Sequence, residues 1–243
     1  MDKSLSSISS PYNWDYLDKR AYNNKVGHYK YRREYKFIVE NGINNFKNIL
    51  DIAGGSGRFA IPLSDYSNNI TVIDVNKEAL KLLSQRKSTI ETIHSDFSAT
   101  EINDSFSIIL CIEAIGNFQN WEEFFDKIHK LLSDDGRFIF TYTNPNSWRF
   151  FLRKLKHLKN GYYPYKEMEL NELKALLVKS NFEIVTMEGL NWIPLSLSSD
   201  SIFVALFEKI EHLLRLKKWH SQSPWLLLSV KKHYKTTSHI GIK

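Results

Sequence analysis

The sequence predicts an α/β fold in which helices cover both faces of a mostly parallel sheet. Between residues 47 and 143, short apolar runs alternate with segments of helical character, and this alternation is typical of a parallel sheet. The content of 42% hydrophobic and 25% charged residues is that of an ordinary globular protein. With 243 residues, the chain is long enough for one domain with a substantial core.

The first part of the chain alternates regularly between the two kinds of element. We expect strands at 47–52, 69–74, 89–94, 106–112 and 137–143, separated by helices at 54–63, 77–86 and 121–132. Asn76 suits the N-cap of the second helix, because its side chain can accept a hydrogen bond from a free backbone N–H. The sequence Ser133-Asp-Asp-Gly136 predicts a turn before the fifth strand.

The alternation ends after Asn144-Pro145. A basic amphipathic helix is expected at 147–159, an aromatic loop at 161–165 and a helix at 170–179. Apolar residues recur at helical spacing over 202–216, and closing strands are expected at 183–188 and 225–231. These elements divide the chain into an N-terminal helical segment (1–45), a core (46–145), and an insert with closing strands of the same domain (146–243).

The net charge of +6 is unevenly distributed, because residues 1–45 carry +3, residues 46–145 carry −5 and residues 146–243 carry +8. Basic ends favour an anionic partner, although solubility alone explains them equally well. The first ten residues lack the apolar segment of a signal peptide, and no apolar run approaches the ~20 residues that span a bilayer. The single cysteine, Cys111, excludes an internal disulfide. We therefore expect a cytoplasmic protein.

The loop after the first expected strand, Asp51-Ile-Ala-Gly-Gly-Ser-Gly57, is the strongest functional signal. Small residues at 53, 55 and 57 allow a ligand to approach the backbone closely, and the following helix N-terminus offers free N–H groups. The spacing differs from the G-x-G-x-x-G pattern of nicotinamide-binding proteins. The acid at the end of the strand, Asp51, suits a cationic ligand group better than a pyrophosphate.

Together with the motifs after the next three strands, this loop resembles the class I S-adenosylmethionine-dependent methyltransferases. The resemblance rests on Ile49–Phe59, Asp74, Ser95-Asp96-Phe97 and Cys111-Ile-Glu-Ala114. It covers residues 45–145 well and the closing strands loosely. It implies a Rossmann-like, doubly wound, mostly parallel seven-stranded sheet with an N-terminal helical lid and an insert after strand five. It also implies S-adenosyl-L-methionine as cofactor and S-adenosyl-L-homocysteine as product.

The resemblance assigns cofactor contacts to individual residues. Asp74, followed by Val75, would hold both ribose hydroxyls, because a carboxylate can accept two hydrogen bonds. Asp96 would bind the adenine amine and Phe97 would flank the ring, whereas helix capping or surface exposure is the alternative for the two acids. The other expected contacts lie in the glycine loop, near the methionine end and in the lid: Asp51, Ala53, Gly54, Gly55, Gly57, Cys111 and Arg32.

Three of these assignments carry alternatives. Ala53 replaces the first glycine of the family's motif as a small substitution. Cys111 is expected to be a packed residue near the methionine end and not a nucleophile. A lid arginine in relatives meets the methionine carboxylate, so Arg32 or Arg33 would do so here, while a solvated helix face is the other interpretation.

Methyl transfer requires alignment of the nucleophile with the methyl group and exclusion of water, and a hydroxyl acceptor gains from a general base. Glu113 and His28 are the candidate bases, although Glu113 equally suits a hydrogen bond to the cofactor or simple solvation. Residues that bind the acceptor are expected among the aromatic side chains of the lid, the fifth strand and the insert: Tyr22, Tyr29, Tyr142, Trp148 and Tyr163. No carboxylate cluster in the sequence predicts a metal site.

We therefore expect an enzyme that O-methylates a small-molecule acceptor, sugar-linked or from another natural-product pathway, with an anionic acceptor among the options. The motif of nucleic-acid amino methyltransferases is missing after strand four and no RNA-binding module is recognisable, so nucleic acid is disfavoured. One alternative is a lipid methyltransferase that docks on a membrane through the basic helices. Another is a non-catalytic protein that binds S-adenosylmethionine. Membrane contact is not favoured, and the oligomeric state is not predicted.

Overall fold

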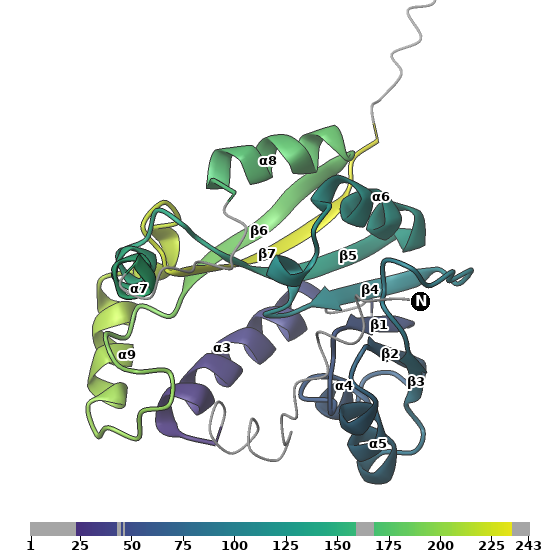
Figure 1. Cartoon of the computed structure of the whole chain (residues 1–243), viewed down its shortest axis with the longest axis horizontal. Coiled ribbons are helices and arrows are strands. Elements are labelled where there is room, and N and C mark those ends of the chain that lie inside the picture. Colours follow the sequence, from purple (N-terminus) through teal and green to yellow (C-terminus); the bar gives the residue numbers. More distant parts are fainter. Residues whose placement is uncertain (1–22, 43–44, 46, 159–167, 235–243) are drawn as a thin grey trace, which may run out of the picture.

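Seven strands form one sheet with helices on both faces in the computed structural model of the chain (Figure 1). The structure describes residues 23–42, 45, 47–158 and 168–234. The strand order is β3-β2-β1-β4-β5-β7-β6, and β7 runs antiparallel to both of its neighbours. The direction of the strand order reverses between β1 and β4, and ligands of open α/β sheets bind at the carboxyl ends of the strands at such a point.

The predicted strands and helices are present, with ends that differ by a few residues from most of the expected ranges. The strands are β1 Ile49–Ile52, β2 Ile70–Asp74, β3 Glu91–His94, β4 Phe106–Cys111, β5 Leu132–Thr143, β6 Phe182–Leu190 and β7 Trp225–Lys232. The helices are α3 Lys25–Gly42, α4 Ala60–Leu63, α5 Lys77–Arg86, α6 Trp121–Leu131, α7 Trp148–Leu158, α8 Leu170–Lys179 and α9 Val204–Leu213, with the short 3-10 helices η2 Ile115–Asn117 and η3 Leu216–Lys218. The cap predicted for α5 is confirmed, because Asn76 accepts a hydrogen bond from the backbone N–H of Ala79.

The prediction of a separate turn at 133–136 was wrong, because these residues belong to β5. They bulge out of the ladder: Phe106 and Ile108 of β4 pair with Leu132 and Arg137 of β5. Four residues of β5 therefore stand opposite a single residue of β4. A bulge of this kind bends a strand without ending it.

The core lies on both faces of the sheet. On one face, α6 and α8 cover aromatic residues that pack on one another, among them Phe125, Phe138 and Phe182. On the other face, α3, α4 and α5 cover the apolar residues of the opposite side. Every residue of β1 and β2 is buried, as expected for strands that are covered on both sides.

The described part of the expected lid, α3, packs against the sheet as a structural helix. Its residues Tyr29, Phe37 and Ile38 are buried in the core, and the helix contacts β5, β6 and β7. Residues 25–42 of the expected lid thus cover the sheet with their apolar face and bring Lys30 to Glu113 at its edge, and the role of this segment as a lid stays a prediction. Tyr22 and the residues before it lie outside the described residues.

The polar face of α9 points into the protein. Glu211 is buried, and it accepts hydrogen bonds from the Tyr29 hydroxyl and the Arg33 guanidinium. One turn earlier, Glu208 lies 2.8 Å from Arg32 in a more exposed ion pair. A buried carboxylate is costly unless it is paired and hydrogen-bonded, so the contacts with α3 fix the orientation of α9.

No helix in the described part of the chain is long and apolar enough to cross a membrane.

The two ion pairs between α3 and α9 predict unequal effects of two similar substitutions. Arg33→Ala leaves Glu211 buried with only the Tyr29 hydroxyl and is expected to lower the free energy of unfolding by about 3 kcal/mol. Arg32→Ala removes an exposed pair and is expected to cost less than about 1 kcal/mol. Urea denaturation of both variants measures the difference. Equal effects would show that α9 is not held by its buried carboxylate.

Candidate functional site

Acidic residues lie at the carboxyl ends of four adjacent parallel strands. Asp51 lies in β1, Asp74 ends β2, and Asp96 and Glu113 lie two residues beyond the ends of β3 and β4. Because these strands are parallel neighbours, their carboxyl ends meet at one edge of the sheet. The motifs that the sequence singled out separately are therefore brought together at the point where the strand order reverses.

The glycine loop between β1 and α4 follows a path that requires small residues. Ala53, Gly55 and Gly57 have φ angles of 57°, 55° and 87°, which keep the chain out of helical geometry. The helix predicted to begin at Gly54 therefore begins only at Ala60. A Cβ atom at Gly54 would lie 2.6 Å from Oδ2 of Asp51, so the loop passes directly over this carboxylate.

Asp51 provides a buried carboxylate with one oxygen that no group in the described part of the chain satisfies. The residue is 2% exposed, and among the described residues its Oδ2 atom has no hydrogen-bond partner. Burial raises the pKa of Asp51 to about 7, opposed by the nearby Arg58 and reinforced by Asp74. A cationic ligand group beside Asp51 would supply the missing partner and favour the charged form.

Asp74 and Asp96 are both held by backbone N–H groups. Asp74 accepts from Gly55 at 2.9 Å and from Asn76 at 2.8 Å. Burial raises the pKa of Asp74, while these hydrogen bonds act in the opposite direction. Asp96 accepts from the backbone N–H of Ser98 at 2.8 Å, a local turn contact. Each carboxylate oxygen can accept a further hydrogen bond, so both groups can also serve a ligand.

Two of the residues expected at the cofactor have buried side chains. The ring of Phe97 is 3% exposed and packs edge-on against Phe118 and Phe124, so it belongs to the core, and its contact with an adenine stays a prediction. Cys111 is fully buried, and burial raises the pKa of its thiol, which suits a packed residue. Val75 lies in the loop after β2, where its carbonyl oxygen is 3.1 Å from Nε2 of His94.

A network of buried charges joins α3 to the loops after β1 and β4. Nζ of Lys30 lies 2.9 Å from Oε1 of Glu113. Nη1 of Arg58 lies 2.8 Å from the same oxygen and 3.3 Å from Oε2 of Glu34. Lys30 and Glu34 are buried on α3, while Arg58 and Glu113 are slightly exposed. The network therefore ties the glycine loop to the sheet edge and to the helix that covers it.

The two carboxylates of this network have shifted pKa values of opposite sign. Burial raises the pKa of Glu34 to about 8, because Arg58 and Lys30 offset only part of the desolvation. For Glu113 the effect of burial is outweighed by Arg58 and Lys30, which lower its pKa to about 2. A carboxylate of such low pKa is a weak base. The geometry therefore disfavours Glu113 as the general base.

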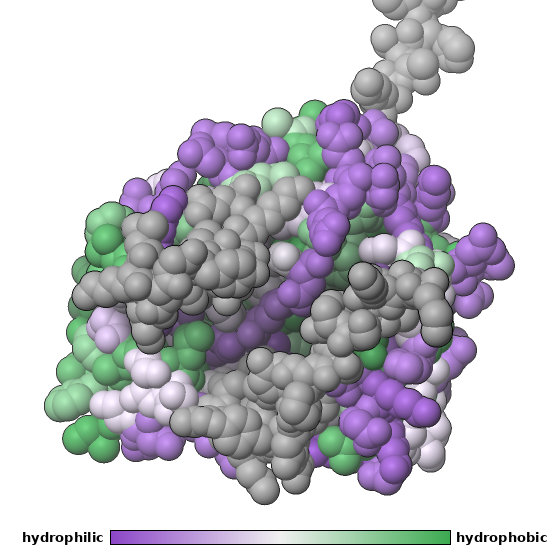
Figure 2. Space-filling view, in the orientation of Figure 1, coloured by the Kyte–Doolittle hydropathy of each residue, from purple (hydrophilic) through white to green (hydrophobic). Residues whose placement is uncertain are grey.

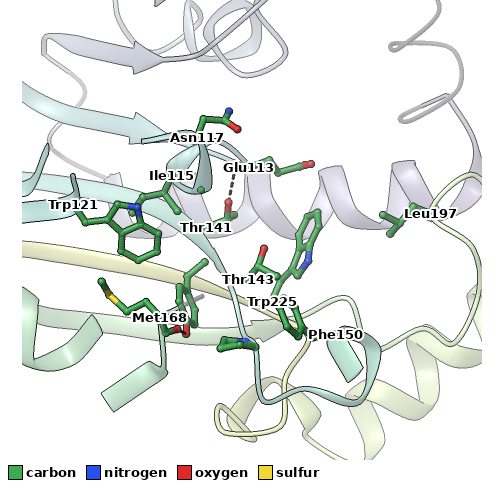
Figure 3. Close-up of a pocket in the computed structure, with 13 residues that line it drawn as sticks. Glu113, Ile115, Asn117, Trp121, Thr141, Thr143, Phe150, Met168, Leu197 and Trp225 are labelled. Atoms are coloured by element: carbon green, nitrogen blue, oxygen red, sulfur yellow. Dashed lines mark hydrogen bonds between the residues drawn. The ribbon is translucent and has the colours of Figure 1, made fainter. Parts of the chain in front are cut away.

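A cavity of about 310 Å³ lies next to Glu113 at the ends of β4 and β5 and the start of β7 (Figure 3). Its walls combine aromatic side chains with a few polar groups, including the Thr141 hydroxyl, which accepts a hydrogen bond from the backbone N–H of Glu113. The lining residues are Glu113, Ile115, Gly116, Asn117, Trp121, Thr141, Tyr142, Thr143, Pro145, Phe150, Met168, Leu197 and Trp225. Mostly apolar walls with a few polar groups are typical of small-molecule sites.

Of the residues predicted to bind the acceptor, Tyr142 lines this cavity and donates its hydroxyl hydrogen to the carbonyl of Met168. Tyr29 is fully buried against Glu211, so the expectation that it touches the acceptor was wrong for this conformation. Trp148 is half-buried with the Arg149 guanidinium over its ring, and the cavity is lined instead by Phe150. Tyr163 lies outside the described residues.

The remaining predicted residues lie on α3. His28 is exposed in the first turn of the helix, and Arg32 pairs with Glu208 of α9. The cations that lie beside the glycine loop and Glu113 are instead Lys30 and Arg58. The expectation for Arg32 thus had the right helix and the wrong residue for a cation at this edge of the sheet.

Several residues of the site could not be identified from the sequence as functional candidates, among them Lys30, Arg58, Trp121 and Trp225. Lys30 and Glu34 are four residues apart on one helix, and this spacing can indicate a shared charged face. Nothing in the sequence places Trp225 beside β5, because the pairing of β7 with β5 joins segments more than 80 residues apart. Within the described ranges, no group of three or more side chains suits a metal ion.

The chain matches the family model of a methyltransferase domain over residues 22–187. This range includes the glycine loop, the acidic residues at the strand ends and most of the cavity walls. The chain therefore belongs to this family of methyltransferase domains, and its fold is that of the class I S-adenosylmethionine-dependent methyltransferases.

The names of similar proteins specify methylation at different atoms of the acceptor. A ubiquinone biosynthesis O-methyltransferase of Rickettsia typhi is 24% identical over 153 residues, which cover 58% of this chain and 62% of that protein. A ubiquinone/menaquinone biosynthesis C-methyltransferase of Zymomonas mobilis is 28% identical over 111 residues, 43% of this chain and 46% of that protein. The chain thus spans less than two thirds of the length of these curated relatives.

Solved structures share the fold at lower identity. A structure of an S-adenosylmethionine-dependent methyltransferase from Clostridium acetobutylicum has a TM-score of 0.62 and 16% identity, and the match covers 91% of this chain and 98% of that one. The N-methyltransferase NodS from Bradyrhizobium japonicum, in complex with S-adenosyl-L-homocysteine, has a TM-score of 0.61 and 16% identity, with 96% of this chain and 98% of that one covered.

The raised pKa of Glu34 predicts a pH dependence of stability. The folded protein keeps a proton on Glu34 up to about pH 8, whereas the unfolded chain releases it near the ordinary pKa of about 4.3. Stability is therefore expected to fall as the pH rises between these values, by at most about 1.4 kcal/mol per pH unit from this group. Glu34→Gln mimics the protonated form and should flatten the decline. Urea denaturation at pH 6, 7 and 8 is the measurement, and parallel curves for both proteins would contradict the prediction.

Proposed function

We propose that the protein is an S-adenosylmethionine-dependent methyltransferase that transfers the methyl group to a hydroxyl of a small, ring-bearing molecule. The observation that carries the proposal is the buried Asp51 carboxylate under the glycine loop, whose Oδ2 has no partner among the described residues. A ligand with a cationic group satisfies that carboxylate, whereas a pyrophosphate would be repelled by it.

The residues around Asp51 fit the proposed cofactor. The glycine loop brings backbone close to the ligand because a Cβ at Gly54 would meet Asp51 and Val72. Asp74 is fixed by Gly55 and Asn76 and has lone pairs left for the ribose hydroxyls. Asp96, after β3, would take the adenine amine. Lys30 and Arg58, close to the loop, would face the methionine carboxylate in place of Arg32.

When bound, S-adenosylmethionine supplies a methyl group on a positively charged sulfur, and the product is S-adenosylhomocysteine. The protein's task is to align the acceptor with this methyl group and to exclude water. In the proposal, Asp51 and Asp74 lie on the side of the site that binds the cofactor, and the cavity beside Glu113 is the side that binds the acceptor. Glu113 contacts both sides, because it pairs with Arg58 from the glycine loop and lines the cavity. We assign it a positioning role in preference to proton transfer.

The cavity supports a ring-bearing acceptor. Trp121, Trp225 and Phe150 supply flat apolar walls, and Asn117 and Thr143 supply polar groups for hydroxyls. Aromatic faces suit sugar rings and aromatic rings alike. The name of the Rickettsia typhi relative, an O-methyltransferase, supports oxygen as the acceptor atom, while the C- and N-methyltransferases among the similar proteins are the competing cases.

The cofactor part of the proposal predicts binding of S-adenosylhomocysteine that depends on Asp74. Loss of a carboxylate that accepts two ligand hydroxyls is expected to weaken binding by about tenfold or more in Asp74→Ala, since hydrogen bonds to a charged group contribute about 1.5–3 kcal/mol each. Isothermal titration calorimetry measures the dissociation constant. Asp104→Ala, at an exposed position before β4, is the matched control and should bind normally. No detectable binding to the wild type would refute the assignment of the cofactor.

The proposal that the cavity binds a hydroxyl acceptor predicts methyl transfer to oxygen and an effect of cavity substitutions on acceptor binding. With ring-bearing hydroxyl compounds as trial acceptors, release of S-adenosylhomocysteine should be detectable, and mass spectrometry should place the methyl group on oxygen. Trp225→Leu should raise the acceptor KM by about tenfold through lost aromatic contact, with a smaller loss of S-adenosylhomocysteine affinity because Lys30 lies over the same ring. Cofactor binding without turnover on any acceptor would favour a non-catalytic binding protein, and an N- or C-methylated product would overturn the assignment to oxygen.

A further inference from the structure

Helix α9 and the two residues before it expose most of their apolar side chains, while Val204 and Phe207 pack against the core. An ordinary surface helix buries its apolar stripe and exposes its charges, but here Glu208 and Glu211 face α3. The outward residues recur at helical spacing, and between 38% and 79% of each is exposed: Ile202, Phe203, Leu206, Ile210 and Leu213. Because the buried Glu211 contacts with Arg33 and Tyr29 fix this orientation, the apolar stripe cannot turn inward without breaking them.

A second helix extends the same apolar region. Phe151, Leu152 and Leu155 of α7 are each 46–61% exposed. α7 and α9 lie at the same end of the molecule (Figure 1), and Arg149 at the start of α7 donates hydrogen bonds to the carbonyls of Ile193 and Leu195 in the segment leading to α9. Figure 2 shows hydrophobic residues gathered along this edge. We call the exposed apolar residues of the two helices the α7–α9 surface. Exposed apolar residues that gather in one region and are rimmed by polar residues often mark an interaction site.

The charges around the α7–α9 surface are predominantly positive. Exposed cations lie within or just after the two helices: Lys154, Lys209, Arg215, Lys217 and Lys218. The acids of the same region are turned inward or paired, because Glu211 is buried with Arg33 and Glu188 pairs with Lys217. Apolar residues surrounded by cations suit an interface that is apolar beneath an anionic layer.

We propose that the protein docks on an anionic lipid bilayer through the α7–α9 surface, as a peripheral protein with α7 and α9 lying in the interface. A second copy of the chain fits less well, because a two-fold contact through this surface would bring the two sets of cations together. The α7–α9 surface is also close to the cavity, because Phe150 of α7 lines the cavity and its neighbour Phe151 belongs to the surface. The docking surface does not depend on the identity of the methyl acceptor.

Vesicle flotation tests the proposal without any measurement of methyl transfer. The full-length protein should float with vesicles that contain phosphatidylglycerol and not with pure phosphatidylcholine, and binding should weaken with added salt. Leu213→Asp should lower the partition coefficient by about tenfold or more, because a leucine no longer enters the apolar layer and a repelled charge replaces it. Lys209→Glu/Lys218→Glu should lower it by about fivefold or more for each cation removed.

The matched control is Val178→Asp on α8, which is 71% exposed on the opposite face of the sheet. It should float like the wild type, and all variants should keep their S-adenosylhomocysteine affinity, which separates a failure of docking from a failure of the proposed function. Equal losses in Leu213→Asp and Val178→Asp would overturn the proposal. So would a wild type that ignores anionic vesicles, or a dimer in sedimentation velocity that Leu213→Asp dissociates without any vesicle binding.

Discussion

The buried ion pairs among Lys30, Glu34, Arg58 and Glu113 connect the parts of the protein that the proposed function needs. Two of these residues lie on α3, one in the glycine loop and one after β4. Removing the Glu113 carboxylate would leave Lys30 and Arg58 without their shared counter-charge away from water, and such a loss is typically far more costly than the pair is stabilising. The glycine loop, the sheet edge and the covering helix are therefore constrained as a unit. The protonated state of Glu34 near neutral pH lets two cations and one anion share a small volume.

This arrangement divides the site into two halves with different physical characters. The half around Asp51 and Asp74 is acidic and tightly built from backbone and carboxylates, which suits a ligand of fixed chemistry. The half around Trp121 and Trp225 is apolar and aromatic, which suits a ligand recognised by shape. Glu113 lies between them with a φ angle of 61°, an unfavourable backbone conformation for a residue with a side chain. The ion pairs with Lys30 and Arg58 provide a physical reason for this conformation to persist.

Pairing of buried charges also fixes the neighbouring helix α9, through residues of α3 adjacent in sequence to Lys30 and Glu34. Arg33 and Tyr29 hold Glu211 in the interior, and the consequence is that α9 presents leucine, isoleucine and phenylalanine to the outside. A helix that paid no electrostatic penalty would rotate to bury these residues, since each buried leucine contributes about 1.5–3 kcal/mol. Leaving Glu211 buried without Arg33 and Tyr29 would be costly, and this cost opposes the rotation. The α7–α9 surface is thus a consequence of charge pairing in the interior as much as of the apolar sequence itself.

The sequence by itself determined the alternation of strands and helices, the seven-stranded sheet and the acids at the strand ends, because local periodicity and short motifs carry that information. Asp51, Asp74 and Asp96 could be named in advance, since each lies at or near the carboxyl end of a strand that the sequence predicts. Only the tertiary structure decided that Arg58 and Lys30, and not Arg32, lie beside the glycine loop, and that Phe97 and Tyr29 are core residues. It also decided which face of α9 points outward, although the apolar stripe at 203, 206, 210 and 213 was visible in the sequence. Such choices depend on contacts between residues far apart in the chain, as between Tyr29 and Glu211, and periodicity shows that a helix has two faces without showing which one is buried.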